Sequence, residues 1–256
     1  GGYVTGTVLK TAIKCGIKTA LHESNSLPGV SVKMLAPKAD LVMLGTEDAK
    51  KHLGECKKCV VTGNPLRNNI PIEEKSAARK RLGLPDCLTI LSAGGSQGAS
   101  RLNEAVVQLL AYEHGRDTFM QSLEDNGVDA GNPHFIIKEY IDNMYTCMCA
   151  SDLIITRAGA MTLTEITAIG RASVLIPYPY AAENHQYYNA LTLQNANAGR
   201  IIDDKELTGS VLIDTVNRLA DDPELLRLMS ENAAKLSKRD AAGIILREIT
   251  ELMGIK

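Results

Sequence analysis

The sequence predicts an α/β fold in which a mostly parallel sheet is covered by helices on both faces. Short apolar runs recur along the chain, separated by longer segments whose apolar residues have helical spacing. Glycine-rich turns follow several of these runs. This alternation favours parallel strands, because each intervening helix carries the chain back across one face of the sheet.

Size and composition restrict the function classes. The chain has 256 residues, which fits one large domain or two modest ones. Hydrophobic residues make up 45% and charged residues 23%, as is typical of a soluble globular protein. The net charge of −2 gives no reason to expect nucleic acid as a partner. No apolar run approaches the ~20 residues of a membrane-spanning helix. Because the chain begins with Gly1 rather than Met, we expect its true start to be missing.

The first segment, residues 1–67, is predicted to contain three strands and two helices. We expect a glycine-rich turn at 1–6, a helix that ends before Gly16, a helix after Pro28, and strands at 18–22, 41–44 and 60–62. The polar residues 22–25 end the first strand, at the edge where open α/β sheets bind ligands. They could instead simply cap the helix that follows. The turn-rich stretch 62–67 predicts a domain junction.

A second segment restarts after Pro85 with an apolar strand at 88–93, followed by the glycine-rich loop 94–99 and a helix. Flexible glycines, one hydroxyl and a helix N-terminus are typical of a phosphate-binding loop. The loop has neither the spacing of the dinucleotide-binding fingerprint nor the Gly-Lys-Ser/Thr of a Walker loop. A Rossmann dehydrogenase is therefore not indicated.

Beyond this helix the alternation fails. Two helical patterns follow each other across residues 97–126, joined at 112–117, where a strand would be expected. We therefore expect residues to be missing there. The alternation then resumes, with strands predicted at 134–138, 153–156, 173–176 and 200–202, helices at 142–150, from 161 and over 183–198, and three helical stretches at the end.

One strand–turn–helix unit, residues 153–165, combines the features of an anion site. Gly159 and the alanines beside it leave room for a close ligand, and the first N–H groups of the helix favour negative charge. Glu165 follows about one turn later, where a carboxylate could accept hydrogen bonds from a sugar diol. The alternative is an ordinary βα unit in which Glu165 is a first-turn acid favoured by the helix dipole.

The six cysteines allow two interpretations. Cys56 and Cys59 could combine with Cys147 and Cys149 in a zinc site. However, Cys59 leads into an apolar strand, and the second pair falls in a predicted helix, where residues i and i+2 point apart. Reduced thiols are therefore the favoured interpretation.

Seven motifs occur in order along the chain: Gly-Gly-Tyr-Val-Thr-Gly at 1–6, His-Glu-Ser-Asn at 22–25, Thr-Gly-Asn-Pro-Leu-Arg at 62–67, Gly-Gly-Ser-Gln-Gly at 94–98, Tyr-Ile-Asp-Asn-Met at 140–144, Arg-Ala-Gly-Ala-Met-Thr-Leu-Thr-Glu at 157–165 and Glu-Asn-His-Gln at 183–186. Together they closely resemble those of the MurG family. These bacterial glycosyltransferases add N-acetylglucosamine to lipid I and so form lipid II for peptidoglycan.

The resemblance implies a GT-B fold, in which two Rossmann-like, doubly wound domains flank a cleft. Residues 1–67 would be the remnant of an incomplete N-terminal domain, on the acceptor and membrane side. Residues 68–240 would form the domain that binds the UDP-sugar. Residues 241–256 would form a helix that crosses back to the N-terminal domain.

The resemblance also implies a donor site for UDP-N-acetylglucosamine. Ser96 and its loop would hold the pyrophosphate, Ile141 the uracil and Glu165 the ribose. Arg67 would approach the nucleotide from the junction, Gln186 would read the sugar hydroxyls, and Asn25 would reach the cleft from the other domain. The full set of implied site residues is Asn25, Arg67, Gly94, Gly95, Ser96, Gln97, Gly98, Ile141, Ala160, Met161, Thr162, Leu163, Thr164, Glu165 and Gln186.

The implied reaction is inverting and needs no cofactor or metal, and the sequence has no Asp-x-Asp motif. The implied acceptor is lipid I, at the inner leaflet of the bacterial membrane, so we expect a peripheral protein on its cytoplasmic face. The expected family base is a histidine in a Gly-Gly-x-Gly-Gly-His loop, which this sequence does not contain. No catalytic residue is therefore predicted within the chain. The alternatives are a donor-binding module that is inactive alone, and another GT-B enzyme such as a lipid glycosyltransferase or a nucleotide-sugar epimerase.

Overall fold

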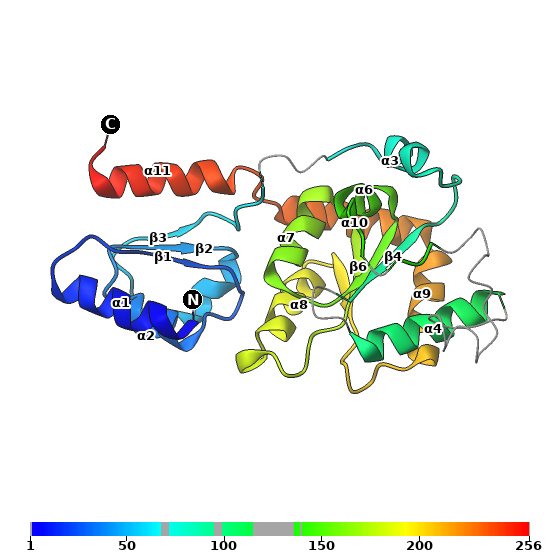
Figure 1. Cartoon of the computed structure of the whole chain (residues 1–256), viewed down its shortest axis with the longest axis horizontal. Helices are drawn as coiled ribbons and strands as arrows, with labels where there is room; N and C mark the ends of the chain where they lie inside the picture. Colours follow the sequence, from blue (N-terminus) through cyan, green and yellow to red (C-terminus); the bar gives the residue numbers. More distant parts are fainter. Residues whose placement is uncertain (1, 68–71, 95–98, 115–135, 139, 256) are drawn as a thin grey trace.

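The computed structural model describes residues 2–67, 72–94, 99–114, 136–138 and 140–255. These residues form two separate parallel sheets, each with helices on both of its faces (Figure 1). No helix in these ranges is long and apolar enough to span a bilayer. All six cysteines are described, and no disulfide joins any two of them.

The first sheet has three parallel strands in the order β1-β2-β3. Helices α1 and α2 cover one face, and α11 lies on the other (Figure 1). The core between α1, α2 and the sheet includes Leu21, Leu35 and Leu44, with Leu9 and Ile13 of α1 packed against it. The elements here are α1 Gly2–Lys14, β1 Ala20–Glu23, α2 Val30–Leu35, β2 Leu41–Leu44, the 3₁₀ helix η1 Glu47–His52, β3 Cys59–Val61 and α11 Ala241–Met253.

The second sheet has four parallel strands in the order β4-β5-β6-β7. Strand β5 is buried on both faces. Leu153 and Ile155 join the core beneath α4, α9 and α10, whereas Ile154 joins the core beneath α6, α7 and α8. The elements are α3 Lys75–Leu82, β4 Ile90–Ala93, α4 Ser100–His114, α6 Met144–Ala150, β5 Leu153–Thr156, α7 Ala160–Ile169, β6 Ala172–Leu175, η2 Ala182–Asn184, α8 His185–Asn195, β7 Gly199–Ile201, α9 Gly209–Ala220 and α10 Pro223–Leu236.

The last helix returns to the first sheet. Lys58, just before β3, pairs with Glu248 and Glu251 of α11 at 2.7 and 3.0 Å. The chain therefore crosses between the two sheets twice, once before α3 and once after α10 (Figure 1). The boundaries 67/68 and 240/241 stay a prediction, drawn close to these two crossings.

Three sequence predictions are wrong in detail. Residues 2–6 belong to α1 and not to a turn, because they extend a helix whose later turns, at Leu9 and Ile13, pack against the core, and extending an existing helix costs little. Residues 136–138 of the predicted strand 134–138 are not a strand, and Ile136 is exposed. The predicted helix 183–198 is divided into η2 and α8, because Glu183 and Asn184 have φ of 51° and 57°.

Candidate functional site

The strand–turn–helix unit has the form that the sequence predicts. Strand β5 ends at Thr156 and α7 begins at Ala160, one residue before the predicted start. Gly159 precedes the helix in an extended conformation, with φ −66° and ψ 139°, and no side chain caps the helix. Among the described residues, no side chain accepts a hydrogen bond from the first-turn N–H groups, Ala160 to Thr162, so these groups could bind an anion.

Glu165 lies on the side of α7 that faces α6. The Tyr145 hydroxyl donates a hydrogen bond to Glu165 Oε1 over 2.9 Å. Burial raises the pKa of the Glu165 carboxyl, while the Tyr145 hydrogen bond and the positive charge of Arg67 act in the opposite direction. The structure thus brings together Arg67 of the junction and Glu165, 98 positions apart in the chain.

Gln186, at the start of α8, is engaged by the protein backbone. Its Oε1 accepts hydrogen bonds from Ala158 N at 3.1 Å and from Tyr178 N at 3.0 Å. It therefore ties the turn before α7 to the loop after β6. Among the described residues, none accepts from its Nε2, so the amide nitrogen is the group left for a sugar hydroxyl.

Arg157, the first residue of that turn, holds the loop after β6 in place. Its guanidinium pairs with Asp204 at 2.5 Å and lies 5.7 Å from the centre of the Tyr178 ring. It also donates to the carbonyl oxygens of Ile176 and Pro177. These contacts make Arg157 a structural arginine that fixes two loops at the C-terminal edge of the sheet.

Asn25 lies where the two halves of the chain meet. Its Oδ1 accepts from Asn189 Nδ2 of α8 at 3.1 Å, and its own amide groups donate to the buried Glu23. Asn189 Oδ1 in turn accepts from Ser26 N at 2.8 Å. Asn25 thus reaches the other half of the chain, through α8.

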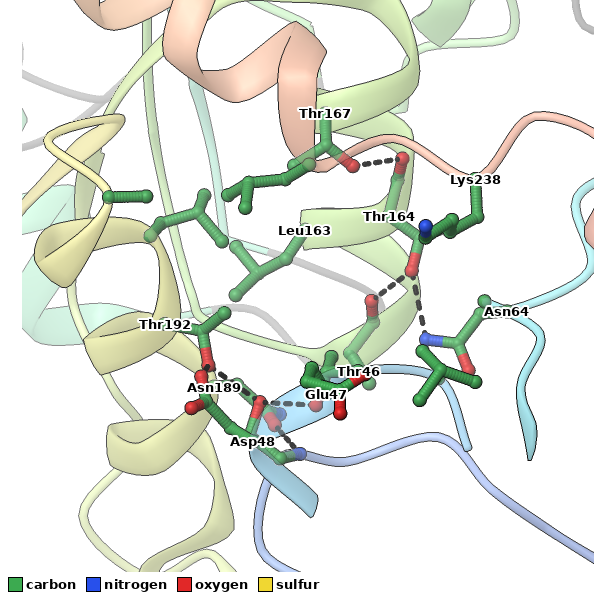
Figure 2. Close-up of a pocket in the computed structure, with 18 of the residues that line it drawn as sticks. Thr46, Glu47, Asp48, Asn64, Leu163, Thr164, Thr167, Asn189, Thr192 and Lys238 are labelled. Carbon is green, nitrogen blue, oxygen red and sulfur yellow. Dashed lines mark hydrogen bonds between the residues drawn. The ribbon is translucent and has the colours of Figure 1, made fainter. Parts of the chain in front are cut away.

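Two further hydrogen bonds extend this contact (Figure 2). Thr192 of α8 donates to Asp48 at 2.8 Å, and Asn64 Nδ2 donates to Thr164 Oγ1 of α7 at 3.0 Å. Gly45 makes room for Asn64, because a Cβ there would lie 2.3 Å from Asn64 Oδ1. We call these contacts, with those of Asn25 and Ser26 to Asn189, the interdomain seam.

A cavity of about 440 Å³ adjoins the seam, lined by residues of both halves (Figure 2). Ala160, Leu163 and Thr164 of the predicted site line it, whereas Met161, Thr162, Glu165, Gln186 and Asn25 do not. Helix α7 therefore divides the predicted residues between two faces. A second cavity, of about 410 Å³, lies on the Glu165 side and is lined by Arg81, Leu82, Asp142, Asn143, Tyr145 and Thr146.

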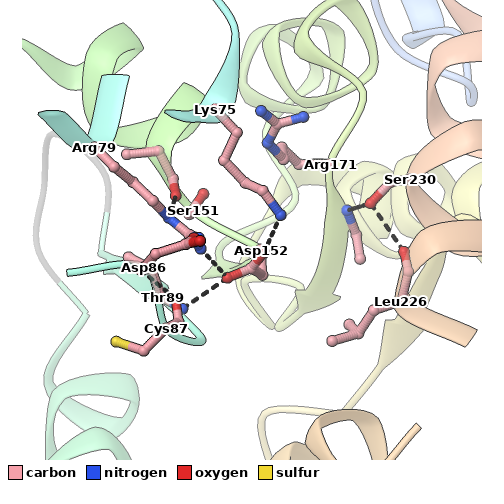
Figure 3. A network of polar contacts seen from close by, with 12 residues as sticks. Lys75, Arg79, Asp86, Cys87, Thr89, Ser151, Asp152, Arg171, Leu226 and Ser230 are labelled. Atoms are coloured by element: carbon pink, nitrogen blue, oxygen red, sulfur yellow. Dashed lines mark hydrogen bonds and ion pairs between the residues drawn. The ribbon is translucent and has the colours of Figure 1, made fainter. Parts of the chain in front are cut away.

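The opposite end of β5 is held by an ionic cluster around the buried Arg79 (Figure 3). Asp152 accepts from Lys75 and Arg79 of α3, each at 2.5 Å, and from Thr89 N at 2.8 Å. Arg79 also donates to the carbonyl oxygen of Ala150 at 3.1 Å. This cluster fixes α3, β4 and β5 relative to one another, and so sets the base from which the turn after β5 projects.

The remaining predicted residues lie near the same edge or outside the described ranges. Gly94 follows β4, and Ile141 is half-buried ahead of α6. Gly95, Ser96, Gln97 and Gly98 lie outside the described residues, as do residues 115–117 of the predicted gap.

Known proteins resemble this chain in sequence and in structure. Residues 89–244 match the model of the glycosyltransferase family 28 C-terminal domain. A UDP-N-acetylglucosamine–N-acetylmuramyl-(pentapeptide) pyrophosphoryl-undecaprenol N-acetylglucosamine transferase of Desulforamulus reducens is 36% identical, over 99% of this chain and 72% of its own length. The enzyme of the same name from Desulfitobacterium hafniense is 38% identical, over 96% of this chain and 71% of its own. The chain belongs to the MurG family.

Solved structures agree with this family. The crystal structure of Acinetobacter baumannii MurG superposes with a TM-score of 0.80 at 28% identity, covering 98% of this chain and 72% of that one. A UDP-GlcNAc 2-epimerase from Neisseria meningitidis gives a TM-score of 0.61 at 15% identity, covering 94% and 72%, which shows a common fold and no more. The GT-B fold implied by the motifs is confirmed.

Sequence reasoning missed several residues that shape this MurG-family site. Four residues outside the predicted donor contacts support the motif residues. Three of them bond a motif residue directly: Tyr145, Asn189 and Asp204. The fourth, Asp152, fixes the strand that carries the motif. Only Asp152 carried a signal, as a polar residue directly before a buried strand. The other contacts join elements distant in sequence, so local spacing holds no trace of them.

Proposed function

We propose that this chain binds UDP-N-acetylglucosamine at the C-terminal edge of its second sheet and transfers the sugar to lipid I, forming lipid II. The observation that carries the proposal is the pairing of the uncapped N-terminus of α7 with the half-buried Glu165 carboxylate one turn later. The first accepts an anion and the second accepts a diol, which are the two polar parts of a nucleoside diphosphate. Membership of the MurG family supports this assignment.

The chemistry requires that the departing diphosphate be stabilised. N–H groups of α7, at Ala160, Met161 and Thr162, would act on it, and so would the Gly94–Gly98 loop with Ser96, as the motif implies. An acceptor hydroxyl would then displace UDP at the anomeric carbon with inversion, as both substrates are held in line. In this proposal the backbone amides stabilise the leaving group without a metal ion or another cofactor.

The other residues take roles that follow from their contacts. Arg67 would balance the charges of Glu165 and of the nucleotide, and Ile141 would meet the base beside the cavity of Tyr145. The Gln186 amide nitrogen would reach a sugar hydroxyl while its oxygen holds the turn. Asn25 would orient the first half against α8 at the mouth of the cleft. Leu163 and Thr164 face the seam, and we propose that they shape the interdomain contact.

The acceptor places the enzyme at a surface. Lipid I is anchored in the inner leaflet, so the proposed working position is peripheral, on the cytoplasmic face of the bacterial membrane. Nucleic acid has no part in this proposal.

Two alternatives remain to be distinguished by experiment. A donor-binding module would bind UDP-N-acetylglucosamine without turnover, and the absence of a Gly-Gly-x-Gly-Gly-His loop from the sequence favours this behaviour for the chain alone. Epimerases share the fold at about 15% identity, but the relatives at 36–38% identity favour glycosyl transfer.

Titration calorimetry of the chain with UDP and UDP-N-acetylglucosamine tests the donor site. We expect both to bind, and UDP-glucose to bind more weakly than UDP-N-acetylglucosamine. A parallel assay with labelled donor and a lipid I analogue in detergent distinguishes transferase from donor-binding module. Conversion of UDP-N-acetylglucosamine to its 2-epimer, or absence of donor binding, would contradict the proposal.

A further inference from the structure

Tyr145 lies between the Glu165 carboxylate, where we propose that the ribose of a bound nucleoside lies, and the second cavity, beside which its base would lie. Its hydroxyl donates to Glu165 Oε1 over 2.9 Å, which joins α6 to α7. The same residue lines the cavity of about 410 Å³ with Asp142 and Asn143, which follow Ile141 directly in the chain. No motif used to identify the family depends on residue 145.

We infer that Tyr145 is a positioning residue of the nucleoside site, which holds the Glu165 carboxylate in the orientation and charge state that accept both hydroxyls of a ribose. The inference rests on the proposed function, in which Glu165 receives the ribose of the donor.

The chemistry of the pair supports this role. An ionised carboxylate offers about four lone-pair sites, and the Tyr145 hydroxyl occupies one of them on Oε1. The remaining sites, including those of Oε2, are left for a vicinal diol. A half-buried side chain with one fixed oxygen loses little orientational freedom when the diol binds, because the protein has already fixed the plane of the carboxylate.

The charge state depends on the same contact. Burial raises the pKa of Glu165 and therefore favours the protonated acid, which cannot accept from two hydroxyls as well as the carboxylate does. The Tyr145 hydrogen bond opposes that change, and so does the positive charge of Arg67. Burial also raises the pKa of Tyr145, so its hydroxyl keeps its proton as the donor at neutral pH.

The groups that act on Glu165 among the described residues are few. Tyr145 faces it from α6 and Arg67 from the junction. Arg239, after α10, lies at the far end of α7, where it donates to the carbonyl oxygen of Ala168 at 3.0 Å. A change of pH near neutrality therefore acts on this carboxylate through a small and identifiable set of neighbours.

The test is a double-mutant cycle of Tyr145→Phe and Glu165→Gln, measured by calorimetry with UDP-N-acetylglucosamine between about pH 5.5 and 8. This ligand is chosen because it lacks the terminal phosphate of UDP, a group that titrates near pH 6. We expect Tyr145→Phe to weaken binding roughly three- to tenfold at about pH 8, the range for one lost hydrogen bond.

The pH profile separates positioning from mere structural support. Loss of the hydrogen bond raises the pKa of Glu165 further, so affinity should begin to fall at a higher pH in Tyr145→Phe than in the wild type. Glu165→Gln should abolish this pH dependence, and adding Tyr145→Phe to it should change affinity less than about twofold. Tyr188→Phe, which removes a hydroxyl from a ring that packs against His52, is the matched control and should leave the profile unchanged.

The outcomes separate the inference from the proposed function. If Glu165→Gln weakens binding while Tyr145→Phe adds the same loss in both backgrounds, the inference is overturned and the proposed donor site stands. A wild-type pH profile in Tyr145→Phe would also overturn the inference. If Glu165→Gln binds as tightly as the wild type, the ribose role of Glu165 is wrong, and the inference fails with it.

Discussion

Two carboxylates at opposite ends of the β5–α7 unit show how an acid held by the protein differs from the acid that we propose binds the ligand. Asp152, before β5, accepts hydrogen bonds from Lys75, Arg79 and Thr89 N (Figure 3). Both acids are half-buried, but Tyr145 is the one hydrogen-bond donor to Glu165, within α7, among the described residues. The first acid has its partners inside the protein, whereas the second has acceptor sites to spare.

The difference matters because a buried carboxylate without enough donors destabilises the fold. Asp152 has enough donors, because it accepts hydrogen bonds from Lys75, Arg79 and Thr89 N, and these bonds hold α3, β4 and β5 together. Glu165 has fewer donors, and burial raises its pKa, which suits a site completed by a ligand. Helix α7 shows the same division, since Thr164 is bonded in the seam while its neighbour Glu165 faces the candidate donor site.

The comparison predicts its largest effect at Asp152. Asp152→Ala should lower the free energy of unfolding by about 3 kcal/mol, because it leaves the buried guanidinium of Arg79 without its main counter-charge. Asp86→Ala is the matched control, since Asp86 bonds the same guanidinium but its side chain is 97% exposed, and should cost less than about 1 kcal/mol. Urea denaturation measures both. Equal losses would show that burial of the partner does not decide the effect.

Glu165 should show the opposite pattern. Glu165→Ala should weaken UDP binding by about 1–3 kcal/mol, the scale of lost hydrogen bonds to a charged group. Its free energy of unfolding should change by less than about 1 kcal/mol, because removal of the side chain also removes a half-buried acid that has one hydrogen-bond donor among the described residues. Calorimetry and urea denaturation on one preparation give both values. A variant that loses stability while it keeps its UDP affinity would place Glu165 in the same class as Asp152.

Gln186 is an intermediate case, because one end of its amide is used by the protein. Gln186→Ala should reduce discrimination between UDP-N-acetylglucosamine and UDP-glucose. It should also lower affinity for UDP itself, by about 1 kcal/mol, because Ala158 N and Tyr178 N lose their acceptor. Competition binding with the three nucleotides measures these changes. Retention of full UDP affinity would mean that the turn before α7 holds its shape without Gln186.

The smallest effect is expected at Asp40, an acid near the protein surface. The hydrogen bond from Lys57, aided by those from Thr19, lowers the pKa of Asp40 to about 2. Because the unfolded chain has a pKa near 3.9, the resulting stability is present above about pH 4 and is lost as pH falls toward 2.

Thermal unfolding between neutral pH and about pH 2 tests the direction of this pH dependence. At neutral pH the free energy of unfolding of the wild type should exceed that of Asp40→Asn by less than about 1 kcal/mol, since the contact is near the surface. This difference should shrink as the pH approaches 2. A difference that grows in acid would contradict the assignment.

The sequence by itself determined most of the succession of strands and helices along the chain, the start of α7 to within one residue, and the family, because these depend on local periodicity and on motifs of adjacent residues. Strand 41–44 was predicted to the residue, and the buried runs 153–156 and 172–175 within one residue. No periodicity or motif in the sequence predicts the positive φ of Glu183 and Asn184, where η2 ends.

Only the tertiary structure decided how many hydrogen-bond donors each acid receives among the described residues. Asp152 meets Lys75 and Arg79 across more than 70 positions of chain, and Asn25 meets Asn189 across 164. Whether such groups touch depends on how helices pack on the sheet and how the two halves meet, and these relations are set by the whole core. Residue spacing reports the periodicity of one element, and it carries no information about the neighbour that packing brings to its side.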